Sequence, residues 1–110
     1  MPRARAPRLS AVSSGYVGIL TFDLHFPEGG SLKAKRKELL SLKSDLQRRV
    51  GASVAEVDHH ELWQRSRITA SCVARDFREL ERLLDDAERY LHGQEFECTR
   101  VERKVVTLDE

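Results

Sequence analysis

Bulky apolar residues alternate with smaller or polar residues between positions 18 and 26. A period of two in a segment rich in β-formers predicts a strand with one buried face. Pro27 and the two glycines that follow at 29 and 30 end the pattern, and Ser31 is a good N-cap for a helix. The side chains that we expect on the buried face are Leu20, Phe22, Leu24 and Phe26.

The period changes after Ser31. From Leu32 to Val50, apolar residues recur at helical spacing, and Gly51 supplies a stop signal. On a helical wheel Leu32, Leu39, Leu46 and Val50 fall within about 40°, with Leu40 and Leu42 beside them. This pattern predicts a helix of about five turns.

The second half of the chain repeats this order of elements. Segments 53–58 and 62–74 alternate again around a polar step at 59–61, which predicts a hairpin with a short loop and with Trp63 as a packed cap at the core edge. Asp76 with Glu79 resembles a capping box, and the apolar stripe that follows ends at Gly93, which predicts a second helix. Residues 95–108 are rich in β-formers and predict a last strand.

The order β-α-β-β-α-β with right-handed crossovers predicts a ferredoxin-like plait of the α+β class. Its antiparallel sheet has the order 4-1-3-2, and both helices lie on one face. Ala55 and Val57 are expected to point toward these helices. Cys72 and Cys98 would flank the first strand about 9–10 Å apart. A disulfide needs Cα atoms within about 7 Å, so we predict two free, buried and inert thiols.

Length and composition favour one domain at 16–110, preceded by an Arg/Pro/Ser-rich extension, residues 1–15, that we predict to be disordered. No apolar stretch approaches the roughly 20 residues of a membrane helix, so no membrane association is expected. The net charge is only +1, but residues 31–50 hold seven cations against two acids, and residues 76–92 hold six acids against three arginines. The sequence thus predicts a basic first helix and an acidic second helix.

The start of the first helix carries an unusual cluster of cations. The helix dipole disfavours positive charge there by about 0.3–1 kcal/mol for each residue, and a helix start is a natural anion site. By phase Lys35, Arg36 and Lys43 fall inside the apolar arc and must extend past the sheet edge or meet acids. The alternative to a binding site is a solvated charged face. The candidate RNA or phosphate contacts are Lys33, Lys35, Arg36, Lys37 and Arg48.

The face of the sheet away from the helices is the second candidate site. Its charged end holds Asp23, His25, Glu56, Asp58, Arg65 and Arg67. Cross-strand ion pairs would account for these residues, and a partner or ligand surface is the alternative. Val17, Ile19 and Val73, with Val105, lie at the apolar end and are the candidate dimer face. The run Asp58-His59-His60-Glu61 lacks a zinc spacing, so we predict no metal site and no cofactor.

Three motifs in order resemble the YlxP-like domain-of-unknown-function family of bacteria: DLH with SLKAKR within 23–36, SVAEVD at 53–58 and LWQR at 62–65. The resemblance covers about 16–105 and implies a ferredoxin-like fold. It also implies a bacterial, cytoplasmic protein whose gene often neighbours those of translation initiation and ribosome maturation factors. The family has no established activity, so the resemblance implies no catalytic residue.

From these observations we predict a non-enzymatic binding protein that associates with RNA or the ribosome through its first helix and that can form a homodimer. An RNA-recognition fold of similar topology would carry aromatic residues where this chain has Thr21, Asp23, Arg67 and Thr69. An enzyme of this topology that resembles acylphosphatase would bind phosphate in a loop and use a catalytic Asn. This chain contains no Asn. The alternatives are a small-ligand enzyme or sensor that uses the polar sheet face, and a purely structural homodimer.

Overall fold

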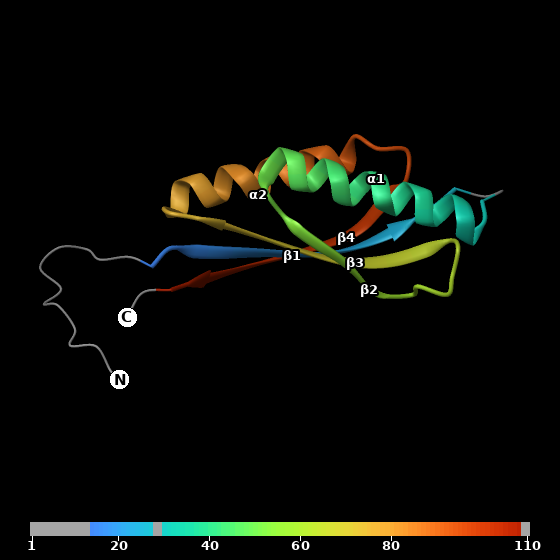
Figure 1. Cartoon of the computed structure of the whole chain (residues 1–110), viewed down its shortest axis with the longest axis horizontal. Helices are drawn as coiled ribbons and strands as arrows, with labels where there is room; N and C mark the ends of the chain where they lie inside the picture. The colour runs from blue at the N-terminus through green and yellow to red at the C-terminus, as the bar shows by residue number, and fades with distance from the viewer. Residues whose placement is uncertain (1–13, 28–29, 109–110) are drawn as a thin grey trace, which may run out of the picture.

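A computed structural model describes residues 14–27 and 30–108. Six elements follow one another along the chain (Figure 1). They are β1 (Tyr16–His25), α1 (Leu32–Val50), β2 (Ser53–Asp58), β3 (Arg65–Ala74), α2 (Phe77–His92) and β4 (Glu97–Thr107). The predicted extension lies outside the described residues except for positions 14 and 15.

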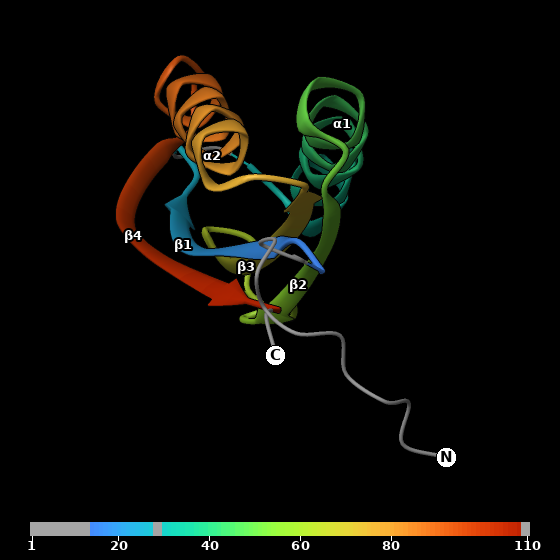
Figure 2. The same cartoon turned by 90° about the vertical axis from the view of Figure 1, so that its left-hand side faces the viewer.

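The sheet has the order β2-β3-β1-β4 with every neighbouring pair antiparallel. Read from the other edge, this is the predicted order 4-1-3-2. Figure 2 shows α1 and α2 side by side above one face of the sheet, while the other face carries no helix. The ferredoxin-like fold is therefore confirmed, and its open sheet face is a defined surface.

The core lies between the helices and the sheet. Alternate residues of β1 are buried there, as the pattern predicts, and they meet the leucines of both helices. Leu40, which was expected beside the apolar stripe of α1, is instead 68% exposed. At about 100° per residue it is turned away from Leu39, toward solvent.

Both helices begin at the predicted caps. Ser31 Oγ accepts a hydrogen bond from the backbone N–H of Ala34 (3.0 Å), and Asp76 Oδ1 accepts one from that of Glu79 (2.8 Å). Gly51 ends α1 in the left-handed conformation, at φ 68°, which a side chain would disfavour. Short-range chemistry is sufficient to set these ends, because each cap contacts only its own first or last turn.

The phase of β2 is opposite to the prediction. Val54 pairs with Ala70 and Glu56 with Ile68, and both partners face the helices. Ala55 and Val57 therefore lie on the open face. Aliphatic residues stand at both parities of this short strand, so its alternation is ambiguous and the register with β3 decides which face is buried.

The second strand of the hairpin starts later than predicted, because β3 begins at Arg65 and segment 62–64 belongs to the loop. Cys72 lies beside Gly18, and Cys98 lies beside Leu24, six residues or about 20 Å further along β1. The predicted separation of about 9–10 Å was wrong, because the register of β4 does not place the two cysteines opposite the same residue of β1. Both thiols are free, as predicted, although Cys98 is only partly buried. Burial raises the pKa of each thiol, so neither is an activated nucleophile.

Candidate functional site

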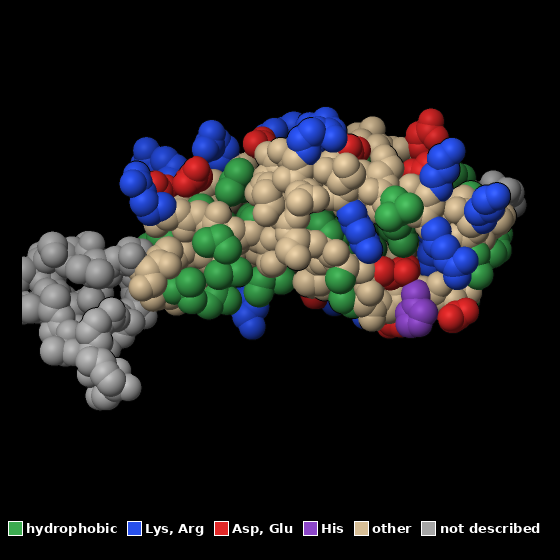
Figure 3. Space-filling model, viewed as in Figure 1, with side chains coloured by type: hydrophobic (Ala, Val, Ile, Leu, Met, Phe, Trp, Pro, Cys, Tyr) green, Lys and Arg blue, Asp and Glu red, His purple; other side chains and the backbone are tan. Residues whose placement is uncertain are grey.

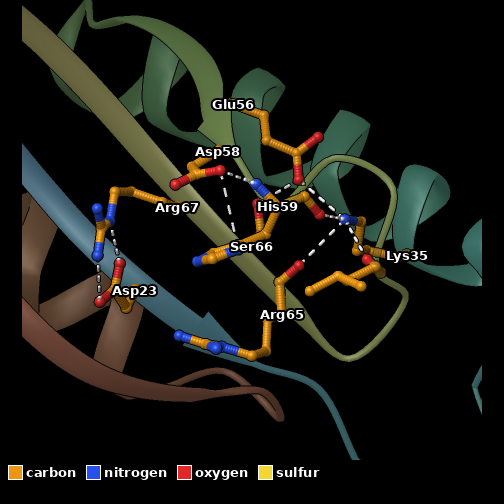
Figure 4. A network of polar contacts seen from close by, with 9 residues as sticks. Asp23, Lys35, Glu56, Asp58, His59, Arg65, Ser66 and Arg67 are labelled. Carbon is orange, nitrogen blue, oxygen red and sulfur yellow. Dashed lines mark hydrogen bonds and ion pairs between the residues drawn. The ribbon is translucent and has the colours of Figure 1, made fainter.

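Lys35, in the first turn of α1, is almost completely buried, with 2% of its surface exposed. Its Nζ donates to Glu56 Oε2 (2.9 Å), to the carbonyl oxygens of His59 (2.8 Å) and Arg65 (3.1 Å), and to that of Leu62 (Figure 4). An ammonium group has three N–H donors, so these four acceptors use all of its capacity. The prediction that Lys35 would meet an acid is confirmed, and its ammonium is not available to an external phosphate.

The same contacts organise the loop between β2 and β3. Glu56 Oε2 accepts a second hydrogen bond, from the fully buried Ser66 Oγ at 2.6 Å. His59 has a left-handed backbone with φ 65°, and its carbonyl also accepts from the N–H of Leu62 at 3.0 Å. We call Lys35, Glu56, Ser66 and the three carbonyls the lysine cage. Glu56, predicted on the open face, belongs to this cage on the helix side of the sheet.

The other cations at the start of α1 face solvent. The prediction that Arg36 lies inside the apolar arc is therefore wrong, because its side chain is exposed. Lys33, Arg36 and Lys37 are exposed and make no ion pair within the described residues. Arg48, also a candidate, pairs with Asp45 at 2.8 Å. At 100° per residue Lys43 adjoins the first three cations, and we call Lys33, Arg36, Lys37 and Lys43 the basic face of α1.

Acidic side chains of α1 lie on its other side, toward α2. Asp45 accepts a hydrogen bond from the Tyr90 hydroxyl at 2.6 Å, and Glu38 lies two turns earlier on the same side. The exposed Leu40 lies among the cations, and Figure 3 shows blue side chains with a hydrophobic one between them over α1. The basic face thus combines cations that make no ion pair within residues 14–27 and 30–108 with an exposed apolar side chain.

On the open sheet face, charges of alternating sign form one row across all four strands. Register places Asp58 beside Arg67, Arg67 beside Asp23, and Asp23 beside Arg100. The central pair is bidentate, with Arg67 Nε 2.7 Å and Nη2 3.3 Å from the two Asp23 carboxylate oxygens. The predicted cross-strand pairing is therefore present for Asp23 and Arg67. His25 and Arg65 are neighbours in the next row and are both exposed.

This pair makes a specific prediction for acid stability. The hydrogen bond from Arg67 holds the pKa of Asp23 below its ordinary value of 3.8. Since the folded pKa is depressed, the stabilisation is complete above about pH 4 and is lost as the pH falls through the folded pKa. We expect Asp23→Asn to lower the free energy of unfolding at neutral pH. The variant should also lose less of this free energy than the parent protein on acidification, as measured by urea unfolding between about pH 2 and 6.

Arg67→Gln should remove the same acid-sensitive component, since neither variant retains the pair. In both variants the loss of stability on acidification should become smaller but should not disappear, because hydrogen bonds from Tyr90 and Arg48 also hold the pKa of Asp45 low. A decrease in Asp23→Asn as steep as in the parent protein would contradict this assignment.

The opposite end of the open face is apolar. Val17 stands between Val73 and Val106 in register, and Val73 is 67% exposed. Ile19 follows in the next row. The expected fourth member, Val105, instead packs against the core, and Val106 takes its place because the register of β4 puts even-numbered residues on the open face here.

A pocket of about 170 Å³ opens at the start of α1. Phe26 and Phe96 form part of its wall, and the ring of Trp63 lies so close to Gly30 that a Cβ there would come within 3.0 Å of it. Trp63 is half-buried in the lining of this pocket. Ser31, Lys35, Glu38 and Glu95 supply the polar part of the lining among the described residues.

Two further features bear on function. Within residues 14–27 and 30–108, no group of three His, Cys, Asp or Glu side chains is placed to hold a metal ion. In the same part of the chain, neither helix is long and apolar enough to cross a membrane.

The fold and these surfaces define a small ferredoxin-like α+β domain with a basic helix and an open sheet face. Residues 17–104 match the model of DUF503, described as a protein of unknown function, and the chain belongs to this family. A comparison with curated proteins gives no match. Among solved structures, the chain is similar to the de novo designed protein Ferredog-Diesel, at 16% identity and a TM-score of 0.41, over 93% of this chain and 97% of that one. The fold assignment rests on the strand order and not on this likeness.

Proposed function

We propose that this protein is a non-enzymatic RNA-binding domain that contacts phosphates through the basic face of α1. The observation that carries the proposal is the absence of acidic partners for Lys33, Arg36 and Lys37 among the described residues. On α2, by contrast, Arg82 and Arg89 pair with acids three residues earlier.

The location of these cations strengthens the proposal. They occupy the first two turns of α1, where the helix dipole repels positive charge. A bound anion would remove this unfavourable term and would also meet the dipole of the helix start. From Lys33 to Lys43 the basic face spans about 15 Å, long enough to contact more than one phosphate of an RNA strand.

The polar groups that a small-ligand enzyme would need are engaged with one another. Asp23 is bound by Arg67, and Glu56 is bound by Lys35 and Ser66. Asp23 is thus engaged on the open face and Glu56 in the lysine cage, which favours a binding role for the protein over catalysis.

The resemblance to the YlxP-like family adds the cellular setting of the proposal. In that setting the protein is bacterial and cytoplasmic, and its RNA belongs to the ribosome. This part follows from the gene neighbourhood that the resemblance implies, so ribosomal RNA is the appropriate first probe.

The proposal predicts the effect of neutralising Lys33, Arg36 and Lys37 with Gln. If each cation contacts a phosphate of single-stranded RNA, the slope of log K against log salt should become less steep by about 0.7 for each, or about 2 in total. Affinity should decrease for every sequence, because phosphate contacts carry no sequence information. Filter binding of ribosomal RNA across a salt series measures both quantities.

A matched control replaces Arg78, Arg82 and Arg89 of α2 with Gln, which changes the net charge equally. The control should retain a salt slope much closer to that of the parent protein. Both variants should keep the parent's melting temperature, because exposed charges contribute little to stability. Equal slopes in the two variants would move the site away from α1, and no binding by the parent at low salt would exclude the RNA function.

A further inference from the structure

The charged and apolar side chains of the open sheet face are arranged so that the face is complementary to a second copy of itself. We propose that a second copy of this chain covers it, face to face, with a two-fold axis that runs along the strands between β3 and β1. This axis places β2 of one copy over β4 of the other and β3 over β1. The proposal is independent of the RNA-binding function, because the basic face lies on α1, on the other side of the sheet.

The charged row is antisymmetric about this axis. Across β2, β3, β1 and β4 the signs run negative, positive, negative, positive at Asp58, Arg67, Asp23 and Arg100. Rotation about the axis puts Asp58 of one copy over Arg100 of the other, and Arg67 over Asp23. Every charge in the row then faces an opposite charge, and each contact occurs twice in the dimer.

The same rotation places apolar residues of one copy opposite apolar residues of the other. The axis runs along the strands, so each row of one copy meets the same row of the other. Val73 therefore lies over Val17, and Thr69 over Thr21. An in-plane axis across the strands would instead bring the valines onto the exposed row of Arg65 and His25. Figure 3 shows hydrophobic side chains gathered where β1 begins, at the end of the sheet that this packing covers.

The size of the face is adequate for a specific dimer. Four strands about 4.8 Å apart and ten residues of about 3.3 Å each give about 600 Å² per copy, or about 1,200 Å² in total. This equals the lower limit for stable specific interfaces. Sheets that pack face to face keep their strands within about 30° of each other, a deviation that long Arg side chains can span.

Two charge reversals on opposite edge strands test the arrangement. Within one chain Asp58 and Arg100 lie three strand spacings apart, about 14 Å, so any coupling between them must act between copies. Asp58→Arg puts like charges over each other at both contacts of its homodimer, and Arg100→Glu does the same. Mixed in equal amounts, the two variants can form a heterodimer in which both contacts again join opposite charges.

Sedimentation equilibrium of the full chain should give twice the monomer mass of 12.6 kDa for the parent protein. Each variant alone should dissociate with a Kd at least about tenfold higher, and the equal mixture should recover to within about threefold of the parent. Val73→Glu, at an exposed position, should also give a monomer that keeps the parent's far-UV circular dichroism spectrum.

Recovery on mixing also establishes that both variants are folded, so loss of the dimer cannot be attributed to unfolding. A parent protein that stays monomeric at high concentration would overturn the proposal. So would variants that dimerise as well as the parent, a dimer insensitive to Val73→Glu, or a mixture that remains monomeric.

Discussion

Replacing Lys35 with Met is expected to lower the free energy of unfolding by about 3–5 kcal/mol, because it leaves one partner of a buried ion pair without its counterion. The Glu56 carboxylate, 15% exposed as a side chain, would keep only Ser66 as a donor. Three backbone carbonyls would lose a hydrogen bond at the same time. Small domains have a total stability of about 5–15 kcal/mol, so this variant should unfold at a much lower urea concentration.

Lys33→Met is the matched control, because it removes the same charge from an exposed position of the same helix turn. It should change stability by no more than about 0.5 kcal/mol. Trp63, the only tryptophan of the chain, lies in the loop that the cage holds, so its fluorescence reports the local effect and circular dichroism the global one. Equal midpoints for the two variants would show that the cage does not stabilise the fold.

The double variant Lys35→Met with Glu56→Gln separates the charge from the packing. It should be less destabilised than the sum of the two single changes, because no unpaired charge remains in the cage. Strict additivity would indicate that Lys35 acts only through the three backbone carbonyls.

Truncating Leu84 to Ala in α2 is expected to cost about 2–5 kcal/mol, through lost burial and the cavity left behind. Leu84 is 2% exposed and packs against β1 at Gly18. Leu40→Ala provides the control, since that leucine is exposed on α1 and should lose no more than about 0.5 kcal/mol. Urea unfolding of both variants gives the comparison, and a similar loss in each would contradict the assigned core.

Gly18 offers a second variant that tests the same contact. A Cβ built there would lie 3.0 Å from both terminal methyl groups of Leu84 and from one of Leu80. Gly18→Ala should therefore destabilise the parent protein by overpacking, and it should be better tolerated when Leu84 is already Ala. An identical effect in both backgrounds would place the glycine away from this leucine.

Local features of the chain were predictable because they depend on neighbouring residues. Ser31, Gly51 and Asp76 act on adjacent turns, so residue type and spacing identify them from the sequence. The alternation in β1 was equally clear, since Leu20, Phe22 and Leu24 share one parity and are all buried. The handedness of the two crossovers then restricted the sheet to the observed order.

Functional interpretation needed contacts between distant segments. Helical phase placed both Lys35 and Arg36 inside the apolar arc, and only their contacts in the folded chain show that Lys35 is buried and Arg36 exposed. Arg100 and Val106 were missed, because the face that each β4 residue occupies follows from its register with β1.

Residue type and spacing were sufficient to predict the elements, their caps, the sheet order and the separation of basic and acidic helices. Each of these follows from short-range periodicity, cap chemistry or the chirality of the chain. Three features became apparent only in the folded chain: the phase of β2, the enclosure of Lys35 by the β2–β3 loop and the alternating charged row. These depend on strand register and long-range packing, in which a shift of one residue moves every side chain of a strand to the other face.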